Sequence, residues 1–248
     1  MAISHLNFRS DVLGKATSVT VYLPDKHLTD YPVLYLLHGL SDDCNSWLDA
    51  TSLARYASAY EFVIVMPQVD LSFYTNMASG DAYWDFLTLE LPQKMAQWLP
   101  ISQLPSRTFV AGQSMGGYGA FKWGMQYPEK FKGVISMSGA LDLVSLWSRD
   151  PDRDGLFNRI FGDKAHLETS DDHLMRLFSS ALNEETAPHF LQICGTEDYL
   201  YADNQTFKHQ ADKAIKQYTY EAYPGDHSWG FWDQQIQRVL AFCDELCS

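Results

Sequence analysis

A serine stands between two glycines at the end of an apolar run, in the segment TFVAGQSMGGYGA at residues 108–120. Gly112, Ser114 and Gly116 form the pattern G-x-S-x-G, which by itself arises by chance in about one chain in twelve. Its context favours a nucleophile elbow, because the apolar run predicts a strand and the small residues after it predict a helix start. The two glycines would leave room where strand and helix pass closely. A Gly-rich phosphate-binding turn fits less well, since the dinucleotide spacing and the P-loop lysine are missing.

A serine hydroxyl needs a general base, and the base needs an acid that orients it. Hydrolases with this elbow carry the three groups in the chain order serine, acid, histidine. Asp198 comes just after the apolar segment FLQIC, and His227 comes just after the last predicted strand. Both are therefore expected at the same sheet edge as Ser114, as catalytic acid and base. Glu197 is the natural competitor for the acid, whereas Asp226 is too close to His227 in the chain to orient it easily.

The remaining seven histidines are weaker candidates for the base. His189 opens a predicted strand, and His38 lies in the turn HGL, where we expect it to pin the loop without a catalytic role. The other five are expected to be exposed or helical: His5, His27, His166, His173 and His209.

The negative charge of a tetrahedral intermediate must be held by preorganised N–H donors. One donor is expected to be the N–H of Met115, directly after the nucleophile. The second should come from the loop VLYLLHGLSDD, where Gly39 lets the backbone approach the substrate and Leu40 supplies the N–H. Further along this loop, Cys44, Asn45 and Trp47 either edge a pocket or lie at the surface.

Eight short apolar runs bounded by turn residues predict strands near residues 3–9, 17–23, 32–37, 61–66, 107–112, 133–138, 189–194 and 218–223. The first two, joined by a turn with Gly14, predict an antiparallel hairpin. Later runs such as VLYLL and FVIVM are apolar throughout, which is typical of parallel strands buried on both faces. Helices are expected near residues 51–60, 82–99, 115–127, 201–216 and 230–246. Their alternation with the strands predicts right-handed βαβ units.

Residues 141–188 interrupt this alternation. They hold a charged turn, RDPDRDG, and two segments predicted to be short amphipathic helices, LFNRIF and HLMRLFSSAL. Ligands of open α/β sheets bind outside the carboxyl ends of the strands, where such insertions also emerge. We therefore interpret residues 141–188 as a cap that contributes to the pocket, with a solvent-facing elaboration as the alternative.

Composition limits the class of partner. The chain has 248 residues, 46% of them apolar, and 18 Lys and Arg against 31 Asp and Glu give a formal charge of −13. Such a surface disfavours nucleic acid and anionic membranes as partners. No apolar run approaches the roughly 18 residues of a membrane span, and the N-terminal segment lacks the pattern of a signal peptide. The cytoplasm is therefore expected, with four reduced cysteines that bind no metal: Cys44, Cys194, Cys243 and Cys247.

The segments LLHGLSDDCNSW, AGQSMGGYGAFKWGMQYPEKF, GTEDYLY and GDHSWGFWD together resemble the esterase D-like branch of the α/β-hydrolases. Within that branch the chain is most similar to the bacterial tributyrin esterases. The resemblance implies an α/β-hydrolase fold: one domain over residues 1–248, with a mostly parallel eight-stranded sheet, flanking helices and residues 141–188 as a short cap. It also implies a triad of Ser114, Asp198 and His227 that needs neither a metal nor an organic cofactor.

The activity implied is hydrolysis of short acyl esters, acetyl to butyryl, through an acyl-enzyme, with acetylated sugars or xenobiotic esters as candidate substrates. One alternative is an acyltransferase that passes the same acyl group to an alcohol. Another is a thioesterase like the S-formylglutathione hydrolases, which usually carry G-H-S-M-G-G-H where this chain has Gln113 and Tyr118. The expected partner is a small-molecule ester, and association into a homo-oligomer stays open.

Overall fold

The computed structural model describes residues 1–26 and 28–247, so that His27 lies outside the described residues. Eight strands form one sheet in the order β1-β2-β4-β3-β5-β6-β7-β8. Their bounds are Ala2–Arg9, Ala16–Leu23, Val33–Leu37, Val63–Pro67, Thr108–Gln113, Gly133–Met137, His189–Gly195 and Tyr218–Tyr223 for β1 to β8. The strands β1 and β2 form the predicted antiparallel hairpin, β2 pairs antiparallel with β4, and all later pairs are parallel. The expected eight-stranded, mostly parallel sheet is thus confirmed.

The continuously apolar strands supply two cores, one on each face of the sheet. In β3, Val33, Tyr35 and Leu37 belong to one core, while Leu34 and Leu36 belong to the other. Successive side chains of a strand point to opposite faces, so a central strand covered on both sides must be apolar at every position. This requirement explains why the runs VLYLL and FVIVM predict buried parallel strands.

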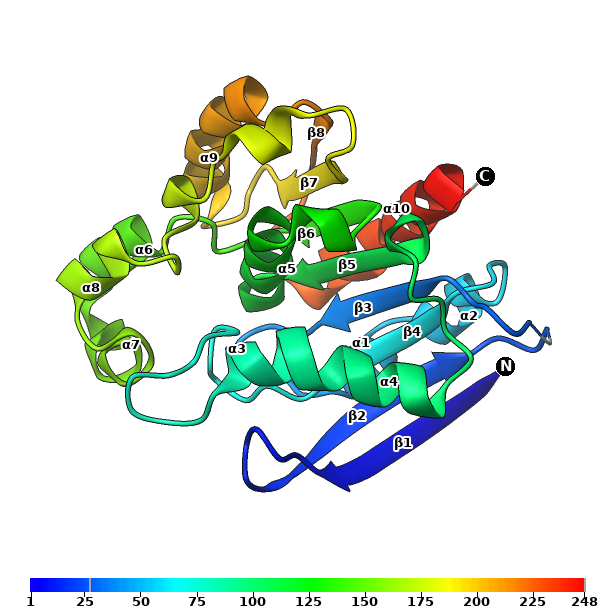
Figure 1. The fold of residues 1–248 in the computed structure, drawn as a ribbon. Helices are drawn as coiled ribbons and strands as arrows, with labels where there is room; N and C mark the ends of the chain where they lie inside the picture. The colour runs from blue at the N-terminus through cyan, green and yellow to red at the C-terminus, as the bar shows by residue number, and fades with distance from the viewer. Residues whose placement is uncertain (27, 248) are drawn as a thin grey trace.

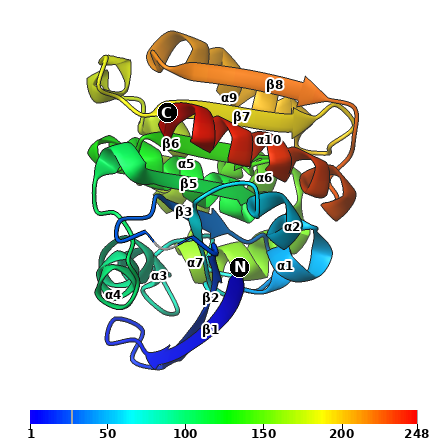
Figure 2. The ribbon, with the colours of Figure 1, turned by 90° about the vertical axis from the view of Figure 1, so that its right-hand side faces the viewer.

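Helices cover both faces, as Figure 2 shows with α3 and α4 on one side of the sheet and α1 and α2 on the other. The first face carries α3 (Tyr83–Asp85), α4 (Leu91–Trp98), α5 (Met115–Gln126) and α9 (Tyr201–Ala214). The second carries α1 (Ser46–Ala50), α2 (Leu53–Ala57) and α10 (Trp229–Cys247). All five expected helices are present among the described residues, although the one expected at 51–60 is confined to α2. A break at Thr51 and Ser52, where the Ser52 N–H donates to Asp233 at 2.7 Å, separates α2 from α1.

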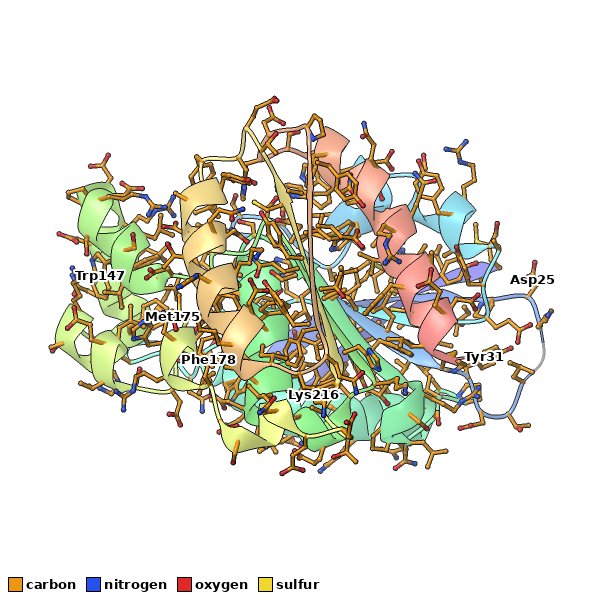
Figure 3. All side chains as sticks on the ribbon, turned by 90° about the horizontal axis from the view of Figure 1, so that it is seen from above. Asp25, Tyr31, Trp147, Met175, Phe178 and Lys216 are labelled. Atoms are coloured by element: carbon orange, nitrogen blue, oxygen red, sulfur yellow. The ribbon has the colours of Figure 1, made fainter. Side chains whose placement is uncertain are left out.

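The insertion at residues 141–188 lies beyond the carboxyl ends of the strands, where the arrowheads of β3 and β5 point in Figure 1. It contains three α-helices, α6 (Leu143–Arg149), α7 (Asp154–Phe161) and α8 (Lys164–Thr169), of which only α7 was expected, from LFNRIF. The helix predicted for HLMRLFSSAL was wrong: this segment forms 3-10 turns at Leu174–Arg176 and Ser180–Asn183. In Figure 3, Trp147 of α6 lies at the outer end of the insertion, and Phe178 lies beside α9.

Three tyrosines with buried rings should make the fold sensitive to alkali. Burial raises the pKa of the Tyr35, Tyr74 and Tyr118 hydroxyls. Above about pH 10 the unfolded chain loses phenolic protons that the folded chain keeps, so the free energy of unfolding should fall as pH rises. In an alkaline titration, we expect the phenolate absorbance of these residues to appear together with loss of the near-UV circular dichroism. Tyr74→Phe should remove one phenolate from that step, and complete titration of all 14 tyrosines before the dichroism changes would contradict the prediction.

Candidate active site

Ser114 sits on a sharp turn between β5 and α5, with φ 53° and ψ −115°. This is a strained conformation for a residue with a side chain, and the surroundings hold it in place. The Ser114 N–H donates to the carbonyl of Met137 at 2.9 Å, and the N–H of Ala140 donates to the Ser114 carbonyl at 3.1 Å. The expected need for glycines is confirmed: a Cβ on Gly112 would lie 2.4 Å from the carbonyl oxygen of Gly116.

The structure brings the three predicted catalytic side chains together in one chain of hydrogen bonds. His227 Nε2 lies 3.0 Å from Ser114 Oγ, and His227 Nδ1 lies 2.8 Å from Asp198 Oδ2 and 3.0 Å from Oδ1. Ser114 follows β5, Asp198 follows β7 and His227 follows β8, all at the carboxyl edge of the sheet. A serine beside one ring nitrogen and a carboxylate beside the other is the arrangement of an activated nucleophile.

Burial separates Asp198 from its two competitors. The Asp198 side chain is fully buried, and its Oδ1 also accepts the Leu200 N–H at 2.8 Å, which fixes the carboxylate. Glu197, one position earlier, is exposed, as is Asp226. Of the two neighbouring carboxylates at 197 and 198, only that of Asp198 is hydrogen-bonded to the histidine.

The loop after β3 is fixed next to the nucleophile by one carboxylate. Asp42 Oδ2 accepts the Gly39 N–H at 3.2 Å and the Gln113 side-chain amide at 2.7 Å. A Cβ on Gly39 would lie 2.3 Å from Gln113 Nε2, so a side chain here would displace the amide that Asp42 holds. Leu40 follows and borders the cavity. On the other side of the serine, Met115 begins α5, and N–H groups in the first turn of a helix lack intrahelical acceptors.

His38 is held in the loop, as expected. It is buried, its Nε2 accepts the Val69 N–H at 3.2 Å, and its Nδ1 therefore donates to the Gly39 carbonyl at 2.8 Å. The Tyr74 hydroxyl donates to the His38 carbonyl at 2.8 Å. Burial lowers the pKa of His38, which favours the neutral ring that this hydrogen-bond pattern requires.

A cavity of about 440 Å³ opens over Ser114 and His227. Leu146 and Arg153 of the insertion border it, together with Phe73 of the core. The Phe73 ring in turn packs edge-on against Phe157 of α7, with ring centres 5.3 Å apart. The insertion thus borders the cavity with its own side chains and also packs behind Phe73, a wall residue from the core.

Three loop residues, for which the sequence did not decide between a pocket edge and the surface, do not border this cavity. Trp47 is buried and donates its indole N–H to the Leu37 carbonyl at 3.1 Å. The N–H of Cys44 donates to Gln68, and Asn45 accepts the Thr20 hydroxyl. All three support the loop from behind and are absent from the lining of the cavity among the described residues.

Aromatic residues around His227 were not singled out from the sequence. The Tyr199 ring lies 4.6 Å from the imidazole, centre to centre, and Trp232 packs against it edge-on at 5.0 Å. Trp229 stacks edge-on against Trp232 at 5.2 Å and also borders the cavity. The signal that could have found them is proximity in the chain, since Tyr199 directly follows Asp198 and the two tryptophans lie within five residues of His227.

In the described ranges, 1–26 and 28–247, no three His, Cys, Asp or Glu side chains lie together in a way that could hold a metal ion. The four cysteines are free thiols. None of the helices in these ranges combines the length and apolarity that a membrane span requires.

The described fold and site match one known family. The family model described as "Putative esterase" matches residues 10–243. The chain belongs to this esterase family. It is similar to an acetyl esterase of Caldicellulosiruptor saccharolyticus, with 29% identity over 264 aligned positions that cover 99% of both chains.

Solved structures support the same assignment of this esterase to the α/β-hydrolases. FphF of Staphylococcus aureus, a fluorophosphonate-binding serine hydrolase, superimposes with a TM-score of 0.86 and 31% identity over 98% of each chain. An S-formylglutathione hydrolase of the same organism gives a TM-score of 0.86 and 32% identity over the same share. The esterase therefore has the α/β-hydrolase fold that the sequence motifs predict, and it acts on ester bonds as a serine hydrolase.

Proposed function

We propose that the protein is a carboxylesterase that removes short acyl groups, acetyl to butyryl, through an acyl-enzyme on Ser114. The observation that carries the proposal is the continuous arrangement of Ser114 Oγ, His227 and Asp198, at 3.0 Å and 2.8 Å. Family membership and the similarity to an acetyl esterase support it.

In the first half-reaction, Ser114 Oγ attacks the ester carbonyl carbon while His227 Nε2 takes the hydroxyl proton. The carbonyl oxygen becomes negative and accepts hydrogen bonds from the N–H groups of Leu40 and Met115, at the N-terminus of α5. The bond to the alcohol oxygen then breaks, and His227 returns the proton to the departing alcohol. In the second half-reaction, water takes the place of the alcohol, its proton passes to His227, and the acid leaves as the Ser114 hydroxyl is restored.

The position of His227 assigns the two parts of the ester to two sides of the cavity. Because His227 protonates the departing alcohol, that part must lie beside Tyr199 and Trp232, which surround the imidazole. Tyr199 is 55% exposed, so this side is open to large alcohols. The acyl group then faces Phe73, which is buried against Phe157 and leaves little room for a long chain.

A series of p-nitrophenyl esters with two to twelve acyl carbons tests this assignment. We expect kcat/KM to be highest at two to four carbons, because each methylene that fits contributes about 0.8 kcal/mol and each that does not fit costs strain. Phe73→Ala should shift the optimum to longer chains, whereas Tyr199→Ala, on the alcohol side, should leave the optimum in place. A preference of the unmodified enzyme for ten or more carbons would contradict the proposal.

A thioester substrate is the second candidate, favoured by the similarity to the S-formylglutathione hydrolase. Two positions argue against it. Gln113 is tied to Asp42, and the Tyr118 hydroxyl donates to the Asp172 carbonyl at 2.7 Å, away from the cavity lining. We therefore expect S-formylglutathione to be hydrolysed with a lower kcat/KM than p-nitrophenyl acetate, a comparison that separates the two candidates.

We further propose that the esterase works in the cytoplasm on small-molecule esters, without nucleic-acid or membrane partners. The four free thiols fit a reducing compartment, and the formal charge of −13 opposes binding to phosphate backbones and anionic lipids.

A further inference from the structure

A second cavity, of about 340 Å³, lies far from the catalytic groups. It borders Thr108, the first residue of β5, and Tyr35, in the middle of β3, whereas Ser114 follows the end of β5. Ile101, another of its walls, forms a β-bridge with Tyr31. In Figure 3, Tyr31 marks this end of the molecule, opposite the end where Trp147 lies. Its volume is in the range of small-molecule sites.

Aromatic rings and a helix irregularity form the walls of this cavity. The ring of Trp123 lies 5.2 Å from that of Tyr35 and 5.1 Å from that of Phe131, centre to centre, and all three border the cavity. Across from them, the helix from α3 to α4 passes through a π-helical segment, Phe86–Glu90, whose Leu89 also borders the cavity. Such π segments occur frequently at functional sites.

A polar group inside this apolar surround lacks a partner. The Trp123 side chain is only 1% exposed, and its indole N–H has no hydrogen-bond acceptor in the described part of the chain. A buried donor without an acceptor costs about 1–3 kcal/mol, a cost that the protein bears in the wall of this cavity.

The charge at the cavity favours an anion. Lys130 is the only charged residue among the described residues that border it. Its ammonium group lies 4.3 Å from the centre of the Tyr127 ring, and none of the described carboxylates forms an ion pair with it. Lys130 therefore places a positive charge at the rim of a cavity whose other described walls are uncharged.

We propose that this cavity is a binding site for a small carboxylic acid with an apolar body. The apolar body lies against Trp123, Phe131 and Leu89, and the carboxylate pairs with Lys130 at the rim and accepts hydrogen bonds from polar groups of the wall. A phosphate or sulfate would need more donors than one lysine supplies, so the single cation and the aromatic floor together select a monocarboxylate. Binding here is independent of catalysis at Ser114.

Titration calorimetry with octanoate tests the site. We expect saturable binding of one octanoate to the unmodified protein, a Kd at least tenfold higher in Lys130→Met, and no binding in Ala96→Trp, which fills the cavity from α4. Lys132→Met, a matched change two residues away and outside the lining, should bind octanoate as the unmodified protein does. Octanol, which lacks the charge, should bind Lys130→Met and the unmodified protein equally. Hydrolysis of p-nitrophenyl acetate should stay the same in all three variants.

Melting curves check that each variant is folded. If Ala96→Trp does not fold, Leu89→Glu serves instead, because this wall position is 49% exposed and the new carboxylate repels the probe. Absence of saturable binding to the unmodified protein would overturn the proposal. The proposal would also be overturned if Lys130→Met and the cavity-filling variant both bound octanoate as tightly as the unmodified protein does, since octanoate would then bind elsewhere.

Discussion

Ser114→Ala will lower kcat by a factor of roughly 10⁴–10⁶, because the acyl-enzyme cannot form without the hydroxyl. The measurement is steady-state hydrolysis of p-nitrophenyl acetate, alongside intact-mass analysis after treatment with a fluorophosphonate. The unmodified protein should gain the mass of one phosphonyl group, since an activated serine attacks such phosphorus centres quickly. The alanine variant should gain none.

Ser138 provides a matched control for this change. Ser138 is buried and lies one residue beyond β6, and its φ of 48° is positive like that of Ser114. Its hydroxyl has no hydrogen-bond partner in the described ranges, so Ser138→Ala should keep both the labelling and most of the activity. Labelling that persists in Ser114→Ala, or that disappears in Ser138→Ala, would place the nucleophile elsewhere.

Asp198→Asn will lower kcat by a factor on the order of 10²–10⁴ while the fold is retained. An asparagine keeps the shape of the side chain but offers an amide to His227 Nδ1, which favours the tautomer that cannot accept the serine proton. The equivalent change in a chymotrypsin-type triad lowers kcat by about 10⁴. Steady-state kinetics and melting curves of the purified variant measure both effects.

Glu197→Gln is the matched control for the acid. Glu197 is exposed, and the imidazole is hydrogen-bonded to Asp198, so kcat of Glu197→Gln should change by less than about tenfold. A severe loss in Glu197→Gln together with nearly normal kinetics in Asp198→Asn would show that the acid stands one position earlier in the chain.

Much of this site could be predicted from sequence because its parts are local. Ser114 follows β5 directly, and Asp198 and His227 lie within four residues of the ends of β7 and β8. Parallel strands bring their carboxyl ends to one edge of the sheet. The walls of the cavity could not be predicted in the same way. Phe73 borders it only because the chain returns from β4 through a loop with positive φ at Phe73 and Tyr74, and no local pattern encodes that path.

In the insertion, a local pattern predicts a helix that does not form, and a helix that does form has a start signal in the sequence. HLMRLFSSAL has helical spacing, yet Phe178 packs on Phe207 of α9 with ring centres 5.3 Å apart, and the Leu182 carbonyl accepts the Lys216 N–H. Such tertiary contacts override propensity. By contrast, α6 begins at an N-cap whose side chain, Asp142, accepts the Ser145 N–H at 2.9 Å. An aspartate before an apolar run is a recognised start signal and could have located that helix.

The order of the strands has a consequence for how activity is acquired during folding. Ser114 and His227 touch across a sequence separation of 113 residues, and His227 follows β8, the last strand in the chain. A folding intermediate that has formed β1 to β6 would hold the nucleophile but neither acid nor base. When the denatured protein refolds, ester hydrolysis should therefore recover later than most of the helical far-UV circular dichroism. The reason is that the contacts of longest sequence separation form last. In an incompletely folded chain, Ser114 thus lacks its general base and cannot attack the esters around it.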